Sequence, residues 1–489
     1  MTAVKIIKFE NNEFEFDKNL FQEIIADYKD MEVAILIVNG AYRTGKSFIL
    51  NFVVDYLNKN TEWKPGYKID KEKIISGFKW SRGSKKETTG IWMWFKPFVF
   101  KNKSGKEMAI MIFDTQGIFD CDLNQKVTTS LFGLSTLLSS YQIYNLEKRI
   151  QEDNLEHLAL FSEYARIAFD DEENKNSKPF QQMDMLIRDW QNFSDVNDKE
   201  KTYQEQEKYK KQIMSANGKG ENLVKTRQQI NQCYENISCS MLPHPGFDVT
   251  EHNYNGEINK IRSGFVKQIE MYLDKIFCSI QPKKIYGRII KLGELTEFIE
   301  NYILVFQKVD NMPEPKTILN ATIDATHKTI ITESYDIYKQ FMDDKMFNSP
   351  YLPNGINNIH SEGTLLALNN FKTSAKIGSD NDKLNSKNRL LLRIDDLRRD
   401  YLQMNENKKT FMDEYSIHLT VALFAYILSW LASNLCWFDV CYRISNFSYF
   451  VFVVVVVFLL YNLYIIFKPY INSNAKILNE IKESKIFNL

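Results

Sequence analysis

The chain has 489 residues, more than one hydrophobic core usually organises, so two or three domains are expected. It carries 62 Lys and Arg residues against 62 Asp and Glu residues, and its formal net charge is zero. Proteins that bind nucleic acid usually carry a basic excess that meets the phosphates. The balanced charge therefore argues against a nucleic-acid partner.

Three apolar runs in the first half of the chain predict buried parallel strands. They are Met31–Asn39, Ala109–Phe113 and, more briefly, Met183–Ile187, with helical stretches between them. This alternation predicts a doubly wound α/β domain. A helical apolar spacing from Asn255 to Cys278 closes the domain, which is expected to span residues 1–278.

The next part of the chain lacks strand signals. Pro282 interrupts the helical pattern in a short linker, residues 279–284. Apolar residues then recur with helical period over Glu294–Lys308, Pro315–Lys345 and Leu384–Lys409. A helical bundle over residues 285–410 is the simplest interpretation.

Two uncharged apolar segments near the C-terminus, Leu419–Phe438 and Phe447–Phe467, are each long enough to cross a bilayer. A polar turn, Asp439–Asn446, joins them and predicts a membrane hairpin over residues 419–467. Soluble helices seldom run this long without a charge, which argues against two helices of a soluble core. Whether the hairpin spans the bilayer or enters one leaflet is left open.

Lysines flank the hairpin on both outer sides, whereas its turn carries only Arg443. The positive-inside rule therefore places both termini in the cytosol. The tail, residues 468–489, is either an amphipathic helix at the membrane surface or a solvated helix. The flanking lysines are Lys408, Lys409, Lys468, Lys476, Lys482 and Lys485.

The six cysteines show neither a CxxC pair nor zinc-ligand spacing. This scatter predicts free thiols in a reducing, cytosolic environment. A pair between Cys436 and Cys441, which flank the predicted turn, is the alternative.

A complete GxxxxGKS sequence, Gly40–Ser47, lies between a predicted strand and a predicted helix, which is the setting of a phosphate-binding P-loop. The loop N–H groups and the helix N-terminus face the phosphates, Lys46 neutralises the β- and γ-phosphate oxygens, and the Ser47 hydroxyl ligates Mg2+. The residues expected around the phosphates are Gly40, Tyr42, Arg43, Thr44, Gly45, Lys46, Ser47 and Phe48.

A second motif, Asp114-Thr115-Gln116-Gly117, directly follows the strand Ala109–Phe113. A carboxylate at this place holds the metal from its second side, and the Gly117 N–H contacts the γ-phosphate. Without the P-loop, the same pattern would be a plain turn as often as a site. Thr88 is the candidate switch threonine that closes over Mg2+.

The residue that organises the attacking water is not evident. Ras-like GTPases carry a glutamine directly after the DxxG motif, where this chain has Ile118. Arg43 within the loop is the candidate arginine finger supplied in cis, an element worth ~10³ to 10⁵ in rate. A solvated loop arginine is the alternative.

Base recognition lacks the usual NKxD motif. Arg188-Asp189 follows the third predicted strand, and its carboxylate can accept hydrogen bonds from the guanine N1–H and amino group while the arginine lies along the base. A surface salt bridge is the alternative interpretation of such a pair.

Taken together, these motifs resemble the atlastins, dynamin-superfamily GTPases that fuse endoplasmic reticulum tubules. The order and spacing of the motifs agree as well. The segments that carry the resemblance are GAYRTGKSFILN (Gly40–Asn51), ETTGI (Glu87–Ile91), FDTQG (Phe113–Gly117), QEDNLEHLALFSEYARIA (Gln151–Ala168), IRDW (Ile187–Trp190) and NISCSMLPHPG (Asn236–Gly246).

The resemblance implies a role for several matching positions. Arg43 becomes the catalytic arginine, Thr88 the switch threonine and Gln116 a nucleotide contact. Arg188 and Asp189 become the guanine readers, and Val249 caps the guanine.

The resemblance also implies a three-helix bundle, GTP as substrate and a homodimer formed between opposing membranes of the endoplasmic reticulum. Trp80-Ser81-Arg82 departs from the family pattern, because the arginine is displaced by one place. Gly90-Ile91-Trp92-Met93-Trp94 looks more like the guanylate-binding proteins, but those proteins generally attach by lipid rather than by a hairpin. A scaffold that shapes tubules without fusing them is the remaining alternative.

Overall fold

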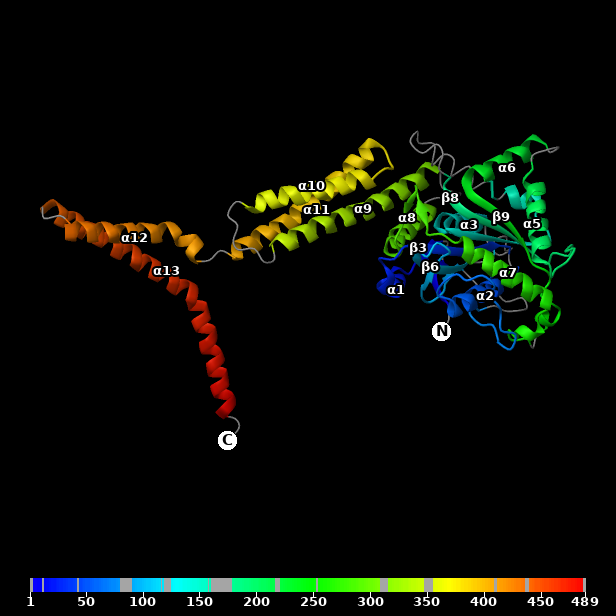
Figure 1. Ribbon diagram of the computed structural model, residues 1–489, viewed down its shortest axis with the longest axis horizontal. Coiled ribbons are helices and arrows are strands. Elements are labelled where there is room, and N and C mark those ends of the chain that lie inside the picture. Colours follow the sequence, from blue (N-terminus) through cyan, green and yellow to red (C-terminus); the bar gives the residue numbers. More distant parts are fainter. Residues whose placement is uncertain are drawn as a thin grey trace. The chain divides into compact units, whose positions relative to one another are not determined.

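We analysed a computed structural model, which divides into two compact units: Met1–Ile330 with Ala375–Lys383, and Ile331–Ser374 with Leu384–Leu489 (Figure 1). The structure describes residues 3–10, 13–41, 44–79, 90–115, 117, 125–156, 158–159, 178–215, 220–251, 254–307, 315–346, 355–408, 411–435 and 439–486.

The first unit is built on a mixed β-sheet with the order β2-β1-β4-β6-β3-β7-β8-β9, and β5 pairs with β6. Parallel pairing joins β6, β3, β7, β8 and β9, as the doubly wound prediction requires. The bounds of these parallel strands are β3 (Val33–Gly40), β6 (Glu107–Thr115), β7 (Tyr141–Glu147), β8 (Phe180–Arg188) and β9 (Tyr234–Met241).

Antiparallel strands extend the sheet beyond β6, which the sequence analysis did not predict. The register pairs Ile91 of β4 with Thr115 of β6, and Val4 of β1 with Met93 of β4. These strands are β1 (Val4–Glu10), β2 (Glu13–Phe16), β4 (Ile91–Met93) and β5 (Phe98–Lys101). Charged residues interrupt or end the apolar pattern in β1, β2 and β5, and β4 has only three residues, so none of these strands has an apolar run as long as that of β3.

Helices cover both faces of this sheet, and β3 is therefore buried along its whole length. Ala34, Leu36 and Val38 pack on one face with α2 (Lys46–Lys59) and α7 (Ser263–Ser279). The alternate residues of β3 pack on the other face with helices α1, α3 and α8. The remaining helical bounds in this unit are α1 (Lys18–Ile25), α3 (Gln125–Leu138), α5 (Lys199–Met214), α6 (Glu221–Cys233) and α8 (Leu295–Gln307).

The chain after the predicted linker still belongs to the first unit. The pair β10 (Lys284–Ile285) and β11 (Arg288–Ile289) precedes α8, whose buried face joins the core of the sheet. Asn301 of α8 donates a hydrogen bond to the Ala321 carbonyl at 3.2 Å in the first part of α9 (Pro315–Met346). The described residues 285–307 and 315–330, predicted as the start of the bundle, therefore belong to the same unit as the α/β domain.

In the second unit the rest of α9 packs with α10 (Gly355–Ser374) and α11 (Asp380–Asn407), which forms the expected bundle. The Tyr338 hydroxyl lies 2.9 Å from Nδ1 of His360, and the Tyr401 hydroxyl donates to Asp343 at 2.6 Å. These contacts join α9 to α10 and to α11. The sequence analysis did not predict α10, because Gly355 and the polar residues that follow it weaken the apolar pattern.

Two apolar helices, α12 (Phe411–Leu435) and α13 (Asp439–Ile486), pack against each other as a hairpin and are long and apolar enough to cross a membrane. The predicted turn, Asp439–Asn446, was placed wrongly, since these residues belong to α13. The side chains of Ser429 and Ser445 donate hydrogen bonds to each other's backbone carbonyls across the two helices. Large apolar side chains on both helices are exposed, including Phe424, Tyr426, Phe450, Val457 and Leu460.

Cys233, Cys239 and Cys278 are not disulfide-bonded, as predicted. Cys441 is disulfide-bonded, so the expectation of free thiols was wrong for this residue. Cys436, the alternative partner considered from the sequence, lies outside the described residues.

Candidate functional site

The P-loop joins the end of β3 to the start of α2, as the motif predicts. Gly45 precedes the helix with a φ of 75°, a left-handed conformation that costs glycine little. A β-carbon on Gly40 would lie 2.3 Å from the Asn145 carbonyl oxygen of β7, so only glycine fits there. Tyr42 and Arg43, two expected phosphate contacts, lie outside the described residues.

Lys46 is the first residue of α2, and its side chain is only 7% exposed. Its ammonium donates to the carbonyl oxygens of Gly40 at 3.2 Å and Ala41 at 2.9 Å, which places it across the loop. Burial lowers the pKa of Lys46 to about 8, and the negative charge of Asp114 opposes this shift. A phosphate placed in the loop would meet this cation and the first N–H groups of α2.

Ser47 and Asp114 meet at the carboxyl end of β6. The Ser47 hydroxyl donates to Oδ2 of Asp114 at 2.5 Å, whereas the buried Oδ1 has no hydrogen-bond partner among the described residues. Burial raises the pKa of Asp114 to about 6, while the Ser47 hydrogen bond and the Lys46 charge lower it. A hydroxyl beside a carboxylate oxygen without a partner suits Mg2+, which takes few protein ligands beside phosphate oxygens and water.

Of the other residues predicted to contact the phosphates or the metal, the structure describes some and not others. Gly117 is buried shortly after β6, and Phe48 is buried in the first turn of α2. Gln116 and Thr88 lie outside the described residues.

Arg188 ends β8 and is 7% exposed. Its Nη1 donates to the Thr44 carbonyl oxygen at 2.8 Å and to the Gly45 carbonyl oxygen at 3.4 Å, so this guanidinium contacts the P-loop. Burial lowers the pKa of Arg188, and the charges of Asp189 and Glu147 oppose that shift. Nε of Arg188 is buried and has no partner among the described residues. The surface salt bridge considered from the sequence does not describe this buried side chain.

Asp189 follows with a φ of 59°, a conformation that is uncommon for residues other than glycine. Its Oδ1 is buried and, within the described part of the chain, has no hydrogen-bond partner. Such an acceptor is available to a ligand that donates hydrogen bonds. Val249 lies in the short 3₁₀ helix Asp248–Thr250 and is 9% exposed.

Asn145 is a polar residue of this site that the sequence analysis missed. It lies in β7 directly opposite Gly40 of β3, and its Nδ2 donates to both the carbonyl and hydroxyl oxygens of Thr44 at 2.8 Å. The signal that would have found it is its place near the carboxyl end of a parallel strand, where α/β domains bind ligands.

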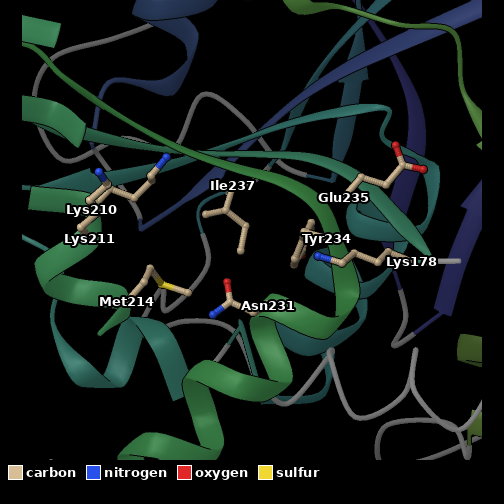
Figure 2. A pocket seen from close by; sticks show the side chains of 8 residues that line it. All are labelled: Lys178, Lys210, Lys211, Met214, Asn231, Tyr234, Glu235 and Ile237. Carbon is tan, nitrogen blue, oxygen red and sulfur yellow. The ribbon is translucent and has the colours of Figure 1, made fainter. Parts of the chain in front are cut away.

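A pocket of about 250 Å³ lies elsewhere, at the start of β9. Figure 2 shows Lys210 and Lys211 of α5 on one side and Lys178 on the other, with the Ile237 side chain between them. This end of β9 is opposite the carboxyl ends of the strands that carry the P-loop. The lining residues are Lys178, Lys210, Lys211, Met214, Asn231, Tyr234, Glu235 and Ile237, so this pocket is separate from the nucleotide site.

Comparison with known proteins agrees with this geometry. The family model of the guanylate-binding protein N-terminal domain matches residues 11–285. Atlastin-1 of Macaca fascicularis is 32% identical over 420 residues, which cover 83% of this chain and 73% of the relative. Atlastin-3 of Homo sapiens is 32% identical over 83% of this chain and 76% of its own length. Atlastin-2 of Macaca fascicularis is 30% identical over 86% of this chain and 75% of its own length.

Proposed function

Because the chain belongs to the atlastin family and is a dynamin-superfamily GTPase, we propose that it tethers and fuses endoplasmic reticulum membranes. GTP-dependent homodimers formed between opposing membranes would bring the bilayers together and create tubule junctions. One observation carries this proposal: a nucleotide site of P-loop geometry lies on the same chain as a hairpin of two apolar helices. GTP is therefore bound and hydrolysed by a domain that the hairpin anchors in the membrane.

In this proposal the P-loop holds the phosphates through its N–H groups and Lys46. Ser47 and Asp114, with Thr88, would hold Mg2+, and the Asp114 oxygen without a partner supports that assignment. When bound there, Mg2+ would supply positive charge that offsets the negative charge of the phosphates. Gln116 and Gly117 contact the nucleotide beside the γ-phosphate.

Hydrolysis depends on a group that stabilises the charge of the transferred phosphoryl. Arg43 is the proposed finger, since it belongs to the loop that wraps the β- and γ-phosphates and Ile118 replaces the water-orienting glutamine. Thr88 closes over the metal when GTP is bound.

Guanine recognition is assigned to Asp189, with Arg188 and Val249 beside the base. The Asp189 carboxylate oxygen accepts from the base N1–H and amino group, and this role suits a buried oxygen that has no hydrogen-bond partner among the described residues. Adenine presents neither of these donors in that arrangement, so the carboxylate favours GTP.

The membrane part of the proposal rests on α12 and α13, whose exposed apolar side chains suit lipid. Both termini lie in the cytosol by the positive-inside rule, and the chain is then a multi-pass protein of the endoplasmic reticulum membrane. The free energy for the conformational change comes from the difference between the contacts that GTP makes in the open form of the domain and those it makes in the closed form.

Lipid mixing between proteoliposomes that carry the full-length chain tests this function. We expect mixing with GTP and Mg2+, and none with GDP or with the Lys46→Ala variant. Nucleotide-dependent tethering without lipid mixing would support the membrane-shaping scaffold instead. If the vesicles show no tethering and no lipid mixing, the proposal is overturned.

A further inference from the structure

The carbonyl group of Thr44 in the P-loop accepts hydrogen bonds from two strands at once. Asn145 Nδ2 of β7 and Arg188 Nη1 of β8 each donate to this oxygen at 2.8 Å. Asn145 Nδ2 also donates to the Thr44 hydroxyl, which in turn donates to the Ala41 carbonyl at 2.8 Å. Both donor side chains are buried, so their amide and guanidinium groups are held in place.

These contacts fix the direction of the peptide group between Thr44 and Gly45. The structure has no cis peptide bond in its described residues, and the C=O and N–H of a trans peptide point in opposite directions. When β7 and β8 hold the Thr44 oxygen on their side, the Gly45 N–H points to the other side, into the loop. P-loops hold the β-phosphate with such inward N–H groups, so a flipped peptide would present an oxygen to an anion.

Asn145 has no other evident task. Its side chain is fully buried, both contacts of Nδ2 go to Thr44, and its Oδ1 has no hydrogen-bond partner among the described residues. A fold that needed only stability would be served there by an apolar residue, since an unpartnered buried oxygen costs free energy. Arg188 differs, because it also lies next to the proposed guanine reader, Asp189.

We propose that Asn145 is a positioning residue that presets the P-loop for the β-phosphate by holding the Thr44–Gly45 peptide group. Arg188 of β8 donates to the same carbonyl oxygen, and the next residue, Asp189, is the proposed guanine reader. The end of β8 therefore connects the guanine site to the P-loop. This inference rests on the proposed nucleotide site, where Asn145 is assigned no contact with phosphate or base and acts through Thr44.

The test is binding of fluorescent GDP and GMP to the full-length protein in detergent, because only GDP carries a β-phosphate. Asn145→Ala should weaken GDP by about tenfold, the loss expected from one buried hydrogen bond, and GMP by less than about twofold. Asn145→Leu keeps the number and branching of the side-chain heavy atoms while removing the donor, and it should give the same selective loss. It also serves if the alanine variant does not fold.

Gln142→Leu is the matched control. Gln142 is also fully buried in β7, but its amide donates to Thr136 at 2.9 Å and accepts from the Tyr234 hydroxyl at 3.3 Å, away from the P-loop. This variant should leave the ratio of GDP to GMP affinity unchanged even where it lowers stability.

Two outcomes overturn the inference: an unchanged GDP affinity in both Asn145 variants, or an equal loss of GDP and GMP. Lys46→Ala separates this failure from failure of the nucleotide site itself. If Lys46→Ala loses GDP while the Asn145 variants keep the wild-type ratio, only the positioning role is wrong. If Lys46→Ala binds GDP as the wild type does, the proposed site falls as well.

Discussion

Ser429 of α12 and Ser445 of α13 each donate a hydrogen bond to the other's backbone carbonyl, at 3.0 and 3.1 Å. Both side chains are 8% exposed. Hydrogen bonds between helices in a bilayer contribute ~0.6 to 2 kcal/mol. Ser429→Val should therefore loosen the hairpin without removing its apolar surface.

Energy transfer between dyes at the outer ends of an isolated hairpin peptide in lipid vesicles measures this loosening. Ser433→Val is the matched control, because Ser433 donates only to Trp430 within its own helix. Equal transfer efficiency in wild type and Ser429→Val would show that the apolar packing alone holds the two helices together.

Asp189→Asn should exchange the base preference from GTP toward XTP. The amide can donate to the xanthine O2, whereas the carboxylate accepts from the guanine amino group. We expect GTP affinity to fall by about 10- to 100-fold, as for loss of a charge-assisted hydrogen bond, and XTP affinity to rise.

Competition binding with both nucleotides measures the exchange. Asp195→Asn, an exposed aspartate in the loop after β8, controls for the loss of one negative charge. An unchanged preference of GTP over XTP in Asp189→Asn would mean that another residue reads the base.

Arg43→Ala should separate nucleotide binding from turnover. A finger acts on the transition state, so we expect kcat to fall by ~10³ or more while GTP affinity stays within a few fold. Single-turnover hydrolysis with bound GTP measures the chemical step directly. Arg399→Ala, an exposed residue of α11, is the control. Wild-type turnover in Arg43→Ala would mean that this side chain is a solvated loop arginine without a catalytic role.

The nucleotide site was predictable where one local motif defines it. Gly40–Ser47 and Asp114 each follow a continuous apolar run, and the structure brings Ser47 and Asp114 together at 2.5 Å. Asn145 was missed because Tyr141–Glu147 mixes polar and apolar residues and does not resemble a buried strand. Its contact with Thr44 joins residues 101 positions apart, which periodicity cannot detect.

The contact of Arg188 with the P-loop could not be predicted from the sequence either. Its place at the end of β8 was predicted, but its hydrogen bond to the P-loop depends on the order of β3, β7 and β8 in the sheet. The hairpin turn was misplaced for a different reason. Residues 439–446 mix polar with apolar side chains and form helix, and Ser445 donates its hydrogen bond across the hairpin.

Lys283 gives a prediction for the pH dependence of stability. Its side chain is 3% exposed, its ammonium donates to the Ser139 carbonyl at 2.8 Å, and burial lowers its pKa from 10.5 to about 7. Between these two values the unfolded chain binds more protons than the folded chain. The contribution of Lys283 to the free energy of unfolding therefore rises with pH, by up to ~1.4 kcal/mol per pH unit.

Lys283→Met removes this titration. We expect the variant to be more stable than the wild type at pH 7, and the difference to shrink toward pH 9. Thermal unfolding followed by tryptophan fluorescence at pH 7, 8 and 9 measures the trend, with the exposed Lys71→Met as the charge-matched control. A difference that does not change with pH would show that Lys283 keeps its proton in the folded chain throughout this range.

Self-association should depend on the nucleotide state. A soluble fragment, residues 1–408, ends before the apolar helices and keeps the α/β domain and the bundle. We expect it to be monomeric without nucleotide and dimeric with GDP and aluminium fluoride, which imitates the phosphoryl group in transfer. Light scattering measures the mass in both states.

The physical reason lies in the hydrolysis machinery. The chain has Ile118 where related switches carry a water-orienting glutamine, so dimer contacts that hold the Arg43 loop and the Thr88 segment would complete the site. Hydrolysis per molecule should then rise with protein concentration until the dimer saturates. Arg399→Ala serves again as the surface control. A fragment that stays monomeric in every nucleotide state, with a rate per molecule independent of concentration, would remove the basis for tethering between membranes.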